Sequence, residues 1–94
     1  MATPLDAEAR SRFSHDHPDW TLDGETASRT LTFADFAEAM GFVNRLALIA
    51  EKADHHPDID VRWNRVTLAV TTHSAKAFTD RDVRLIETID GWEH

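Results

Sequence analysis

Three histidines follow segments whose residue patterns predict secondary structure, and histidine is the side chain that most readily exchanges a proton near neutral pH. His55 and His56 are adjacent and precede Pro57, at the end of a long amphipathic segment. His73 comes soon after the alternating segment 66–70. Imidazole groups can donate and accept protons in catalysis, and they can also bind metal ions. Three interpretations of these histidines are therefore open: an acid–base pair, a metal site, or surface residues at a solvated helix end.

The spacing argues against a metal site. Adjacent helical residues project about 100° apart, so His55 and His56 would rarely bind one ion together. No His-x-x-x-His pair and no third clustered ligand is present, and His15 with His17 is interpreted as a solvated helix end. An acid–base pair and a solvated terminus stay open for His55 and His56, because the helix dipole favours positive charge there in either case. His73, taken alone, could be an ordinary polar residue after a strand.

The segment before His55 is expected to be a helix that runs to about Asp54. Thr32, with Asp35 three residues on, is the expected N-cap, and Pro57 stops the helix. Apolar side chains spaced three and four apart form a stripe over about half of its surface: Phe36, Met40, Val43, Ala47 and Ala50, widened by Phe42, Leu46 and Ile49. Because this stripe is wider than one sheet face needs, we expect a second contact with a partner subunit, in a homodimer or homotetramer.

Four segments are expected to be strands, because they alternate apolar and polar residues or are rich in β-branched ones. They are residues 20–22, 27–33, 59–63 and 66–70, with turns at Asp23-Gly24 and Asn64-Arg65. A weak helical pattern covers Leu5 to about His15, and Thr79 with Asp82 is expected to cap a last helix. The order α-β-β-α-β-β-α predicts an α+β fold, a four-stranded antiparallel sheet with helices packed on one face.

The composition predicts one soluble domain spanning residues 1–94, located in the cytoplasm. The chain has 94 residues, 41% hydrophobic and 29% charged, which suits a single modest core. A net charge of −7 without a basic run argues against nucleic-acid binding, and the absence of cysteine excludes disulfides and thiolate chemistry. We find no signal-peptide pattern and no apolar run near the ~18 residues of a membrane span.

The stretch AEKADHHPDIDVRWNRVTLAVTTH, followed after a short turn by FTDRD, resembles the pterin-4a-carbinolamine dehydratase family. The shared pattern is an acidic helix end, His-His-Pro, a strand hairpin, Thr-His and a Thr-x-x-Asp helix start. A Pro-x-Trp at residues 18–20 and the long helical segment extend the resemblance over nearly the whole chain. His-His-Pro alone is a weak signal, but it becomes specific in register with Thr72-His73 and with Thr79 and Asp82.

The resemblance implies an enzyme, a hydro-lyase that dehydrates 4a-hydroxytetrahydropterin to quinonoid dihydropterin in recycling of the tetrahydrobiopterin cofactor. It implies general acid–base catalysis with no metal and no other cofactor. Carried over by motif position, His55 and His73 would be acids on opposite faces of the pterin. His56 would orient the ring and help to remove a proton, and Asp82 would orient a histidine. The residues expected to border the substrate are Pro57, Thr72 and Ser74.

The alternative is a non-catalytic protein on the same scaffold, an assembly or dimerisation cofactor of the transcription-coactivator or Rubisco-assembly type. The three histidines and Asp82 favour the enzyme, because a protein kept only for binding would not need them. One departure from the family is Ala77-Phe78, where relatives usually have Gly-Leu. It predicts a bulkier turn near His73 and leaves the shape of that loop open.

Overall fold

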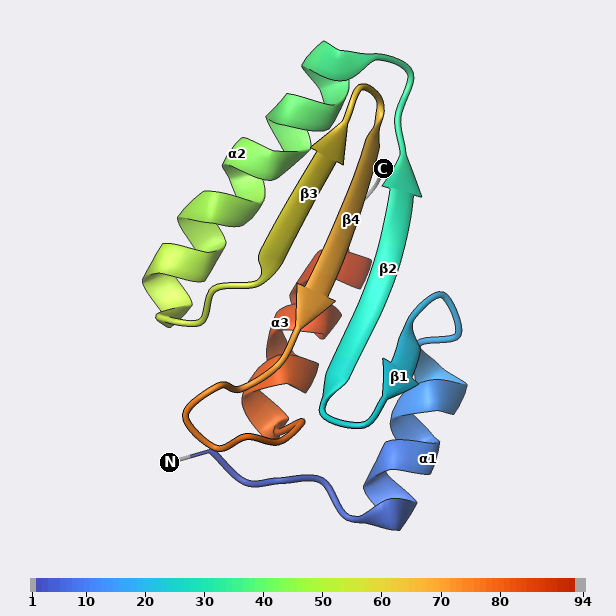
Figure 1. Cartoon of the computed structure of the whole chain (residues 1–94), viewed down its shortest axis with the longest axis vertical. Coiled ribbons are helices and arrows are strands. Elements are labelled where there is room, and N and C mark those ends of the chain that lie inside the picture. The colour runs from blue at the N-terminus through green and yellow to red at the C-terminus, as the bar shows by residue number, and fades with distance from the viewer. Residues whose placement is uncertain (1, 93–94) are drawn as a thin grey trace.

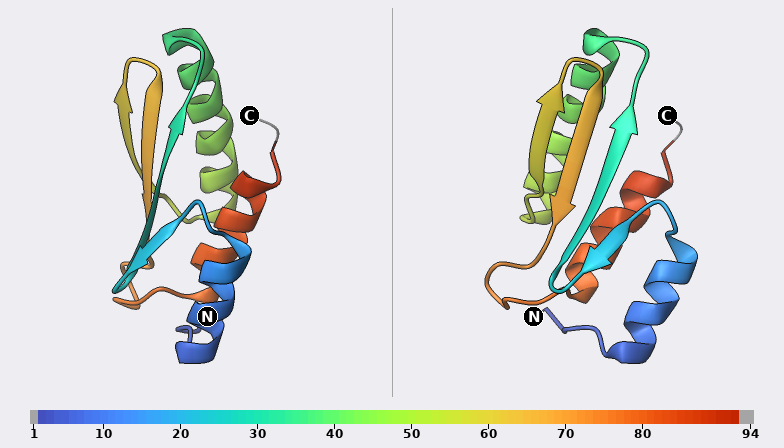
Figure 2. Two further views of the ribbon diagram at one scale, coloured as in Figure 1. Left: turned by 90° about the vertical axis from the view of Figure 1, so that its right-hand side faces the viewer. Right: turned by 45° about the vertical axis from the view of Figure 1, so that its right-hand side comes forward.

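In the computed structural model, which describes residues 2–92, the alternating segments form one antiparallel sheet and the helices cover one of its faces (Figure 1, Figure 2). The elements are α1 (Ala7–Asp16), β1 (Thr21–Asp23), β2 (Thr26–Thr32), α2 (Phe36–Ala53), β3 (Asp58–Arg62), β4 (Arg65–Val70) and α3 (Asp80–Asp90). The strand order is β1-β2-β4-β3. The predicted fold class and element order are confirmed. No helix within the described residues is both long and apolar enough to cross a membrane.

The core lies between the helices and the inward side of the sheet. Because side chains alternate along a strand, Val66, Leu68 and Val70 of β4 are fully buried, whereas Arg65 and Thr67 face solvent. The buried apolar residues of β2, α2 and α3 are Ala27, Leu31, Ala39, Phe42, Leu46, Ala50, Leu85, Ile86 and Ile89, and Phe13 of α1 with the loop residues Trp20, Phe33 and Phe78 completes the core. Burying a large apolar side chain contributes about 1.5–3 kcal/mol, so this layer supplies most of the favourable free energy of folding.

Asp35 caps α2, three residues beyond the predicted Thr32. Its side chain accepts a hydrogen bond from the Glu38 N–H at 2.8 Å, and Glu38 Oε1 accepts one from the Ala34 N–H at 3.2 Å. The Thr32 prediction was wrong because that residue ends β2 and is paired with Arg65. The helix therefore begins at Phe36 and ends at Ala53, close to the predicted end at Asp54.

The buried face of α2 coincides with only one side of the predicted stripe, where Phe42, Leu46 and Ala50 lie. Phe36 is 52% exposed, Ala47 is exposed, and Met40 and Val43 are only partly buried. The residues that pack on the sheet are Ala39, Phe42, Leu46 and Ala50. The helix has more apolar residues than the sheet can cover, so periodicity alone could not decide which of them face the core. Leu48, 74% exposed, and Phe36 leave apolar surface uncovered on this helix.

Both tight hairpin turns lie one residue away from their predicted places. The first is Gly24-Glu25, because Asp23 pairs with Thr26, and the second is Trp63-Asn64, because Arg62 pairs with Arg65. In each turn the first residue has a positive φ, 59° at Gly24 and 50° at Trp63. Tryptophan rarely adopts this conformation. Here Asn64 stabilises the second turn by donating its side-chain N–H to the carbonyl of Phe33, at 2.9 Å.

The bulky turn Ala77-Phe78 points into the core and away from solvent. Phe78 is 1% exposed and packs edge-on against Phe13 of α1, with ring centroids 4.9 Å apart. The Leu5 N–H donates to the Phe78 carbonyl at 3.1 Å, so the N-terminal segment runs beside this loop. The larger side chain therefore serves to dock α1 onto the sheet.

Candidate functional site

The C-terminal end of α2 and the C-terminal end of β4 lie at the same end of the sheet (Figure 1). His55 and His56 follow α2, and His73 follows β4, so the adjacent pair and a third histidine 17 residues later come together there. They share a hollow of about 190 Å³ whose other lining residues are Asp54, Thr71, Thr72, Ser74 and Arg81. Of the residues singled out from sequence, Pro57 is not part of this wall, and Asp82 lies behind His55.

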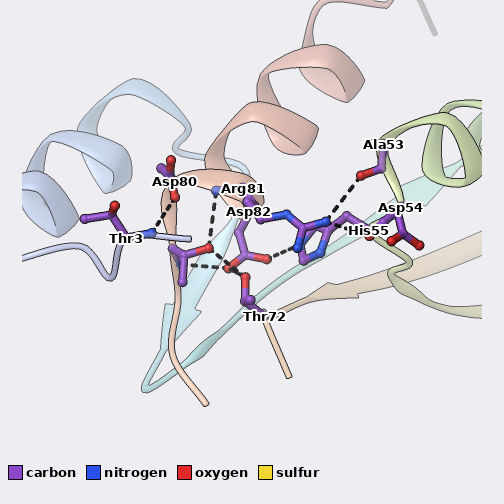
Figure 3. A network of polar contacts seen from close by, with 9 residues as sticks. Thr3, Ala53, Asp54, His55, Thr72, Asp80, Arg81 and Asp82 are labelled. Carbon is purple, nitrogen blue, oxygen red and sulfur yellow. Dashed lines mark hydrogen bonds and ion pairs between the residues drawn. The ribbon is translucent and has the colours of Figure 1, made fainter. Parts of the chain in front are cut away.

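His55 is held by a buried carboxylate. Its Nε2 lies 2.5 Å from Asp82 Oδ1, with His55 8% and Asp82 0% exposed. The other oxygen, Asp82 Oδ2, accepts hydrogen bonds from the Thr79 N–H at 2.8 Å and from Thr72 Oγ1 at 2.9 Å (Figure 3). Buried carboxylates are costly unless their oxygens are paired, and both oxygens of Asp82 are paired.

These contacts determine which nitrogen of His55 can act on a ligand. An ionised carboxylate only accepts hydrogen bonds, so the contact with Asp82 places a proton on His55 Nε2. The Nδ1 atom is then the ring nitrogen that can take up or give a proton. A carboxylate in this position also stabilises positive charge on the ring, as the aspartate does in a catalytic triad.

The local sequence explains why a carboxylate is available behind His55. Thr79 is the N-cap of α3, and Asp82 is the third residue of the helix and completes a capping box with it, as predicted. Thr72 joins the same network, because the Thr72 and Thr79 hydroxyl oxygens lie 2.7 Å apart. Since the Thr72 proton goes to Asp82, Thr79 is the donor in that bond. One helix cap therefore also orients the candidate catalytic histidine.

His56 and His73 are held far more loosely. His56 Nε2 lies 2.5 Å from Glu51 Oε1, and both side chains are exposed, so this pair contributes little to stability. His73 is exposed, and its side chain has no hydrogen bond or ion pair to any described residue. Its carbonyl accepts the Lys76 N–H at 3.2 Å, in a turn where Lys76 has a φ of 50°. The hollow therefore has one rigid histidine and two with freedom to adjust.

Several neighbours were not singled out from sequence. Thr71 Oγ1 is buried and has no hydrogen-bond partner, although Thr71 lines the hollow. Glu51 belongs to the acidic helix end noted in the sequence, but no role was assigned to it. Across residues 2–92, no three histidine or acidic side chains gather closely enough to hold a metal ion.

The two remaining histidines with sequence interpretations lie at the end of α1. His15 is exposed, as expected of a solvated helix end. His17 is not: its Nδ1 lies 2.7 Å from Asp90 Oδ2, and its ring stacks on Phe13. Asp90 also accepts hydrogen bonds from Trp20 and Arg29, so His17 helps to join α1 and β2 to the end of α3.

A four-stranded antiparallel sheet covered on one face by helices, with histidines from a helix end and a strand end in one hollow, defines a small α+β protein with a histidine-lined site. The chain belongs to the pterin 4 alpha carbinolamine dehydratase family, whose model matches residues 3–92. This confirms the family resemblance stated from the sequence.

Related proteins are similar in sequence to this chain over most of its length. A Chloroflexus aurantiacus protein is 49% identical over 73 residues, 78% of each chain, and a Roseiflexus protein is 45% identical over 91 residues, 96% of this chain and 97% of its own. Both carry the provisional name pterin-4-alpha-carbinolamine dehydratase.

Two solved structures are similar in fold. A Brucella melitensis protein described as a transcriptional coactivator/pterin dehydratase has a TM-score of 0.87 at 31% identity, covering 94% of this chain and 96% of its own. A pterin dehydratase-like RuBisCO assembly factor of the alpha-carboxysome has a TM-score of 0.66 at 19% identity, covering 81% and 90%. The second likeness concerns the fold alone.

Proposed function

We propose that this protein is a hydro-lyase that removes water from a 4a-hydroxytetrahydropterin to give the quinonoid dihydropterin. The observation that carries the proposal is the buried pair of His55 and Asp82 in the wall of a hollow that His56 and His73 also line. The departing 4a-hydroxyl leaves with the bonding electrons and needs a proton to become water. The proton on the adjacent ring nitrogen must be removed as the double bond forms. General acid–base catalysis by histidine can supply both transfers.

Each histidine has a distinct proposed role. His55 donates the proton to the departing hydroxyl through Nδ1, while Asp82 holds Nε2 and stabilises the imidazolium. His73 does the same for a substrate isomer whose hydroxyl lies on the opposite face of the ring. His56, whose Nε2 contacts Glu51, orients the pterin and helps to accept the ring-nitrogen proton.

The substrate contacts extend to the neighbouring main chain. Ser74 and Thr72 lie in the wall of the hollow, and Pro57 directly follows His56. Because the Thr72 hydroxyl is already bonded to Asp82, Thr72 would contact the pterin through its backbone. The Thr71 hydroxyl is buried without a partner beside the hollow, and it would bond the polar edge of the ring once substrate binding uncovers it.

A direct dehydration assay tests the proposal. Synthetic 4a-hydroxytetrahydropterin is mixed with the protein, and formation of the quinonoid product is followed against the uncatalysed reaction. We expect acceleration that persists after chelator treatment, because the proposed chemistry uses no metal. A rate equal to that of buffer would contradict the proposed function, and loss of activity with chelator would contradict the metal-free mechanism.

The second candidate is a non-catalytic assembly or coactivator role on the same scaffold. It is favoured by the exposed apolar side chains of Phe36 and Leu48 on α2, each of which could contact another protein. We propose that Leu48, the more exposed of the two, takes part in self-association to a homodimer or homotetramer in the cytoplasm. An inactive chain that binds a larger complex would favour the second candidate.

A further inference from the structure

Arg81 contacts the main chain of the helix end that carries the histidines. Its Nη2 donates to the carbonyl oxygen of Asp54 at 2.6 Å and to that of Ala53 at 3.3 Å (Figure 3). Arg81 lies in the first turn of α3, 27 residues from Asp54 in sequence. The contact therefore joins two elements at the site through a charged donor and two backbone acceptors.

The end of α2 needs such a contact. The last carbonyls of a helix have no partner within the helix, and a charged donor satisfies them better than a neutral one. Asp54 adopts a left-handed conformation with φ 51° and ψ 45°, which is unfavourable for a residue other than glycine. This reversal turns the chain out of α2, and the next residue is His55, whose N–H returns to the Ala50 carbonyl at 3.1 Å.

Two consecutive residues of α3 thus act on His55 in different ways. Asp82 binds the Nε2 atom of its ring, and Arg81 binds the carbonyl of the peptide that leads into it. Asp82 therefore fixes the ring, and Arg81 reinforces the backbone anchor that the His55 N–H makes to the Ala50 carbonyl. Arg81 also lines the hollow together with His55.

We infer that Arg81 is a positioning residue for His55, which acts by holding the Asp54–His55 peptide and so fixes where Nδ1 meets the substrate. The inference rests on the proposed dehydratase function. It assigns Arg81 no contact with the reacting atoms. Small misplacements of a catalytic group cost large factors in rate, so the contact would matter for turnover more than for substrate binding.

The test compares Arg81→Met with Arg84→Met. Both remove one positive charge from α3 and keep an unbranched side chain, but the guanidinium of Arg84 bonds the partly exposed Asp80 of its own helix. We expect Arg81→Met to lower kcat by about 10–100-fold for the isomer that His55 serves, with a smaller change in KM. Arg84→Met should retain the wild-type kcat.

A second readout does not depend on activity. The ¹⁵N and ¹H signals of the His55 ring should shift and broaden in folded Arg81→Met and remain unchanged in Arg84→Met. Arg81→Lys, which keeps a cationic donor, should restore part of the rate and serves if the Met variant does not fold. Unchanged His55 signals in a folded Arg81 variant would overturn the inference. An inactive wild-type protein would contradict only the proposed function, because the ring signals would still decide the role of Arg81.

Discussion

His55 Nε2 lies 2.5 Å from Asp82 Oδ1, and the same carboxylate completes the capping box of α3 through the N–H of Thr79. The structure of a helix start and the orientation of a candidate acid therefore depend on one buried side chain. A substitution at Asp82 should change both stability and catalysis, and this coupling makes it an informative position.

Asp82→Asn is expected to lower both stability and activity. Asparagine supplies one acceptor oxygen where three donors converge, so at least one donor faces an N–H₂ group. A lost buried hydrogen bond of this kind costs about 1–3 kcal/mol, although asparagine on its own is a good helix-capping residue. Urea unfolding monitored by circular dichroism checks the stability, with the exposed Glu87→Gln of the same helix as control. Equal stability of Asp82→Asn and wild type would show that the carboxylate network is not needed.

Thr71→Val is expected to weaken substrate binding without destabilising the free protein. The Thr71 hydroxyl is buried without a partner, so its removal leaves no broken hydrogen bond in the absence of ligand. If the hydroxyl bonds the pterin, valine should raise KM by about 2–13-fold, which corresponds to the usual ~0.5–1.5 kcal/mol of one hydrogen bond. Steady-state kinetics and thermal melting check the two parts. An unchanged KM would remove Thr71 from the substrate contacts.

The docking of the N-terminal segment is expected to weaken in acid. The Thr3 N–H donates to Asp80 at 2.8 Å and holds the pKa of that carboxyl below its usual value of 3.8, with a further contribution from Arg84. A lowered pKa in the folded state means that the ionised form stabilises the fold fully above pH 3.8. This contribution is lost as the pH falls through the lowered folded value.

Melting curves of wild type and Asp80→Asn at neutral and strongly acidic pH check this expectation. Asparagine should reduce the melting temperature at neutral pH, and the difference from wild type should shrink in acid. A difference that stays constant with pH would contradict the assigned role of the Asp80 charge.

The apolar surface on α2 is expected to be covered by another subunit. Wild type should elute as a dimer or tetramer at micromolar concentration, and Leu48→Glu should shift the protein toward a smaller species. Leu48 is already exposed in the single chain, so the charge should leave the fold of the subunit intact. Light scattering on the eluted peaks measures the mass, with Ser11→Glu at an exposed position of α1 as a control that changes the net charge by the same amount. A monomeric wild type would contradict the expectation.

Much of the fold could be predicted because strands and amphipathic helices leave local periodic patterns. The alternation of Val66, Leu68 and Val70 and the Thr79–Asp82 capping pair depend on near neighbours in sequence, and both predictions were right. The orientation of α2 was not predictable in this way. Its surface is apolar on more than one side, and only packing against the sheet selects Phe42 and Leu46 over Phe36 and Met40.

The candidate site was also predictable only in part: sequence motifs identified some of its residues, and others are recognised only from contacts made in the folded chain. The family motif pointed to His55, His56 and His73, and the fold brings them into one hollow. No sequence pattern marked Arg81 or Thr71 as part of the site. Arg81 contacts a backbone carbonyl 27 residues away in sequence, and the Thr71 hydroxyl has no hydrogen-bond partner, so neither contact leaves a local pattern. Arg81 directly precedes Asp82 in a helix start, and that adjacency is the one feature that could have drawn attention to it.

The measurement that tests the central claim most directly is dehydration of the two separated 4a-hydroxypterin isomers by wild type, His55→Ala, His73→Ala and His56→Ala. Circular dichroism first establishes that each variant is folded. Loss of the His55 or His73 acid should reduce the rate about 10²–10⁴-fold for one isomer each, and for opposite isomers. His56→Ala should slow both isomers, because orientation of the ring is common to them. Full activity of folded His56→Ala, or equal loss for both isomers in His55→Ala and His73→Ala, would contradict this account.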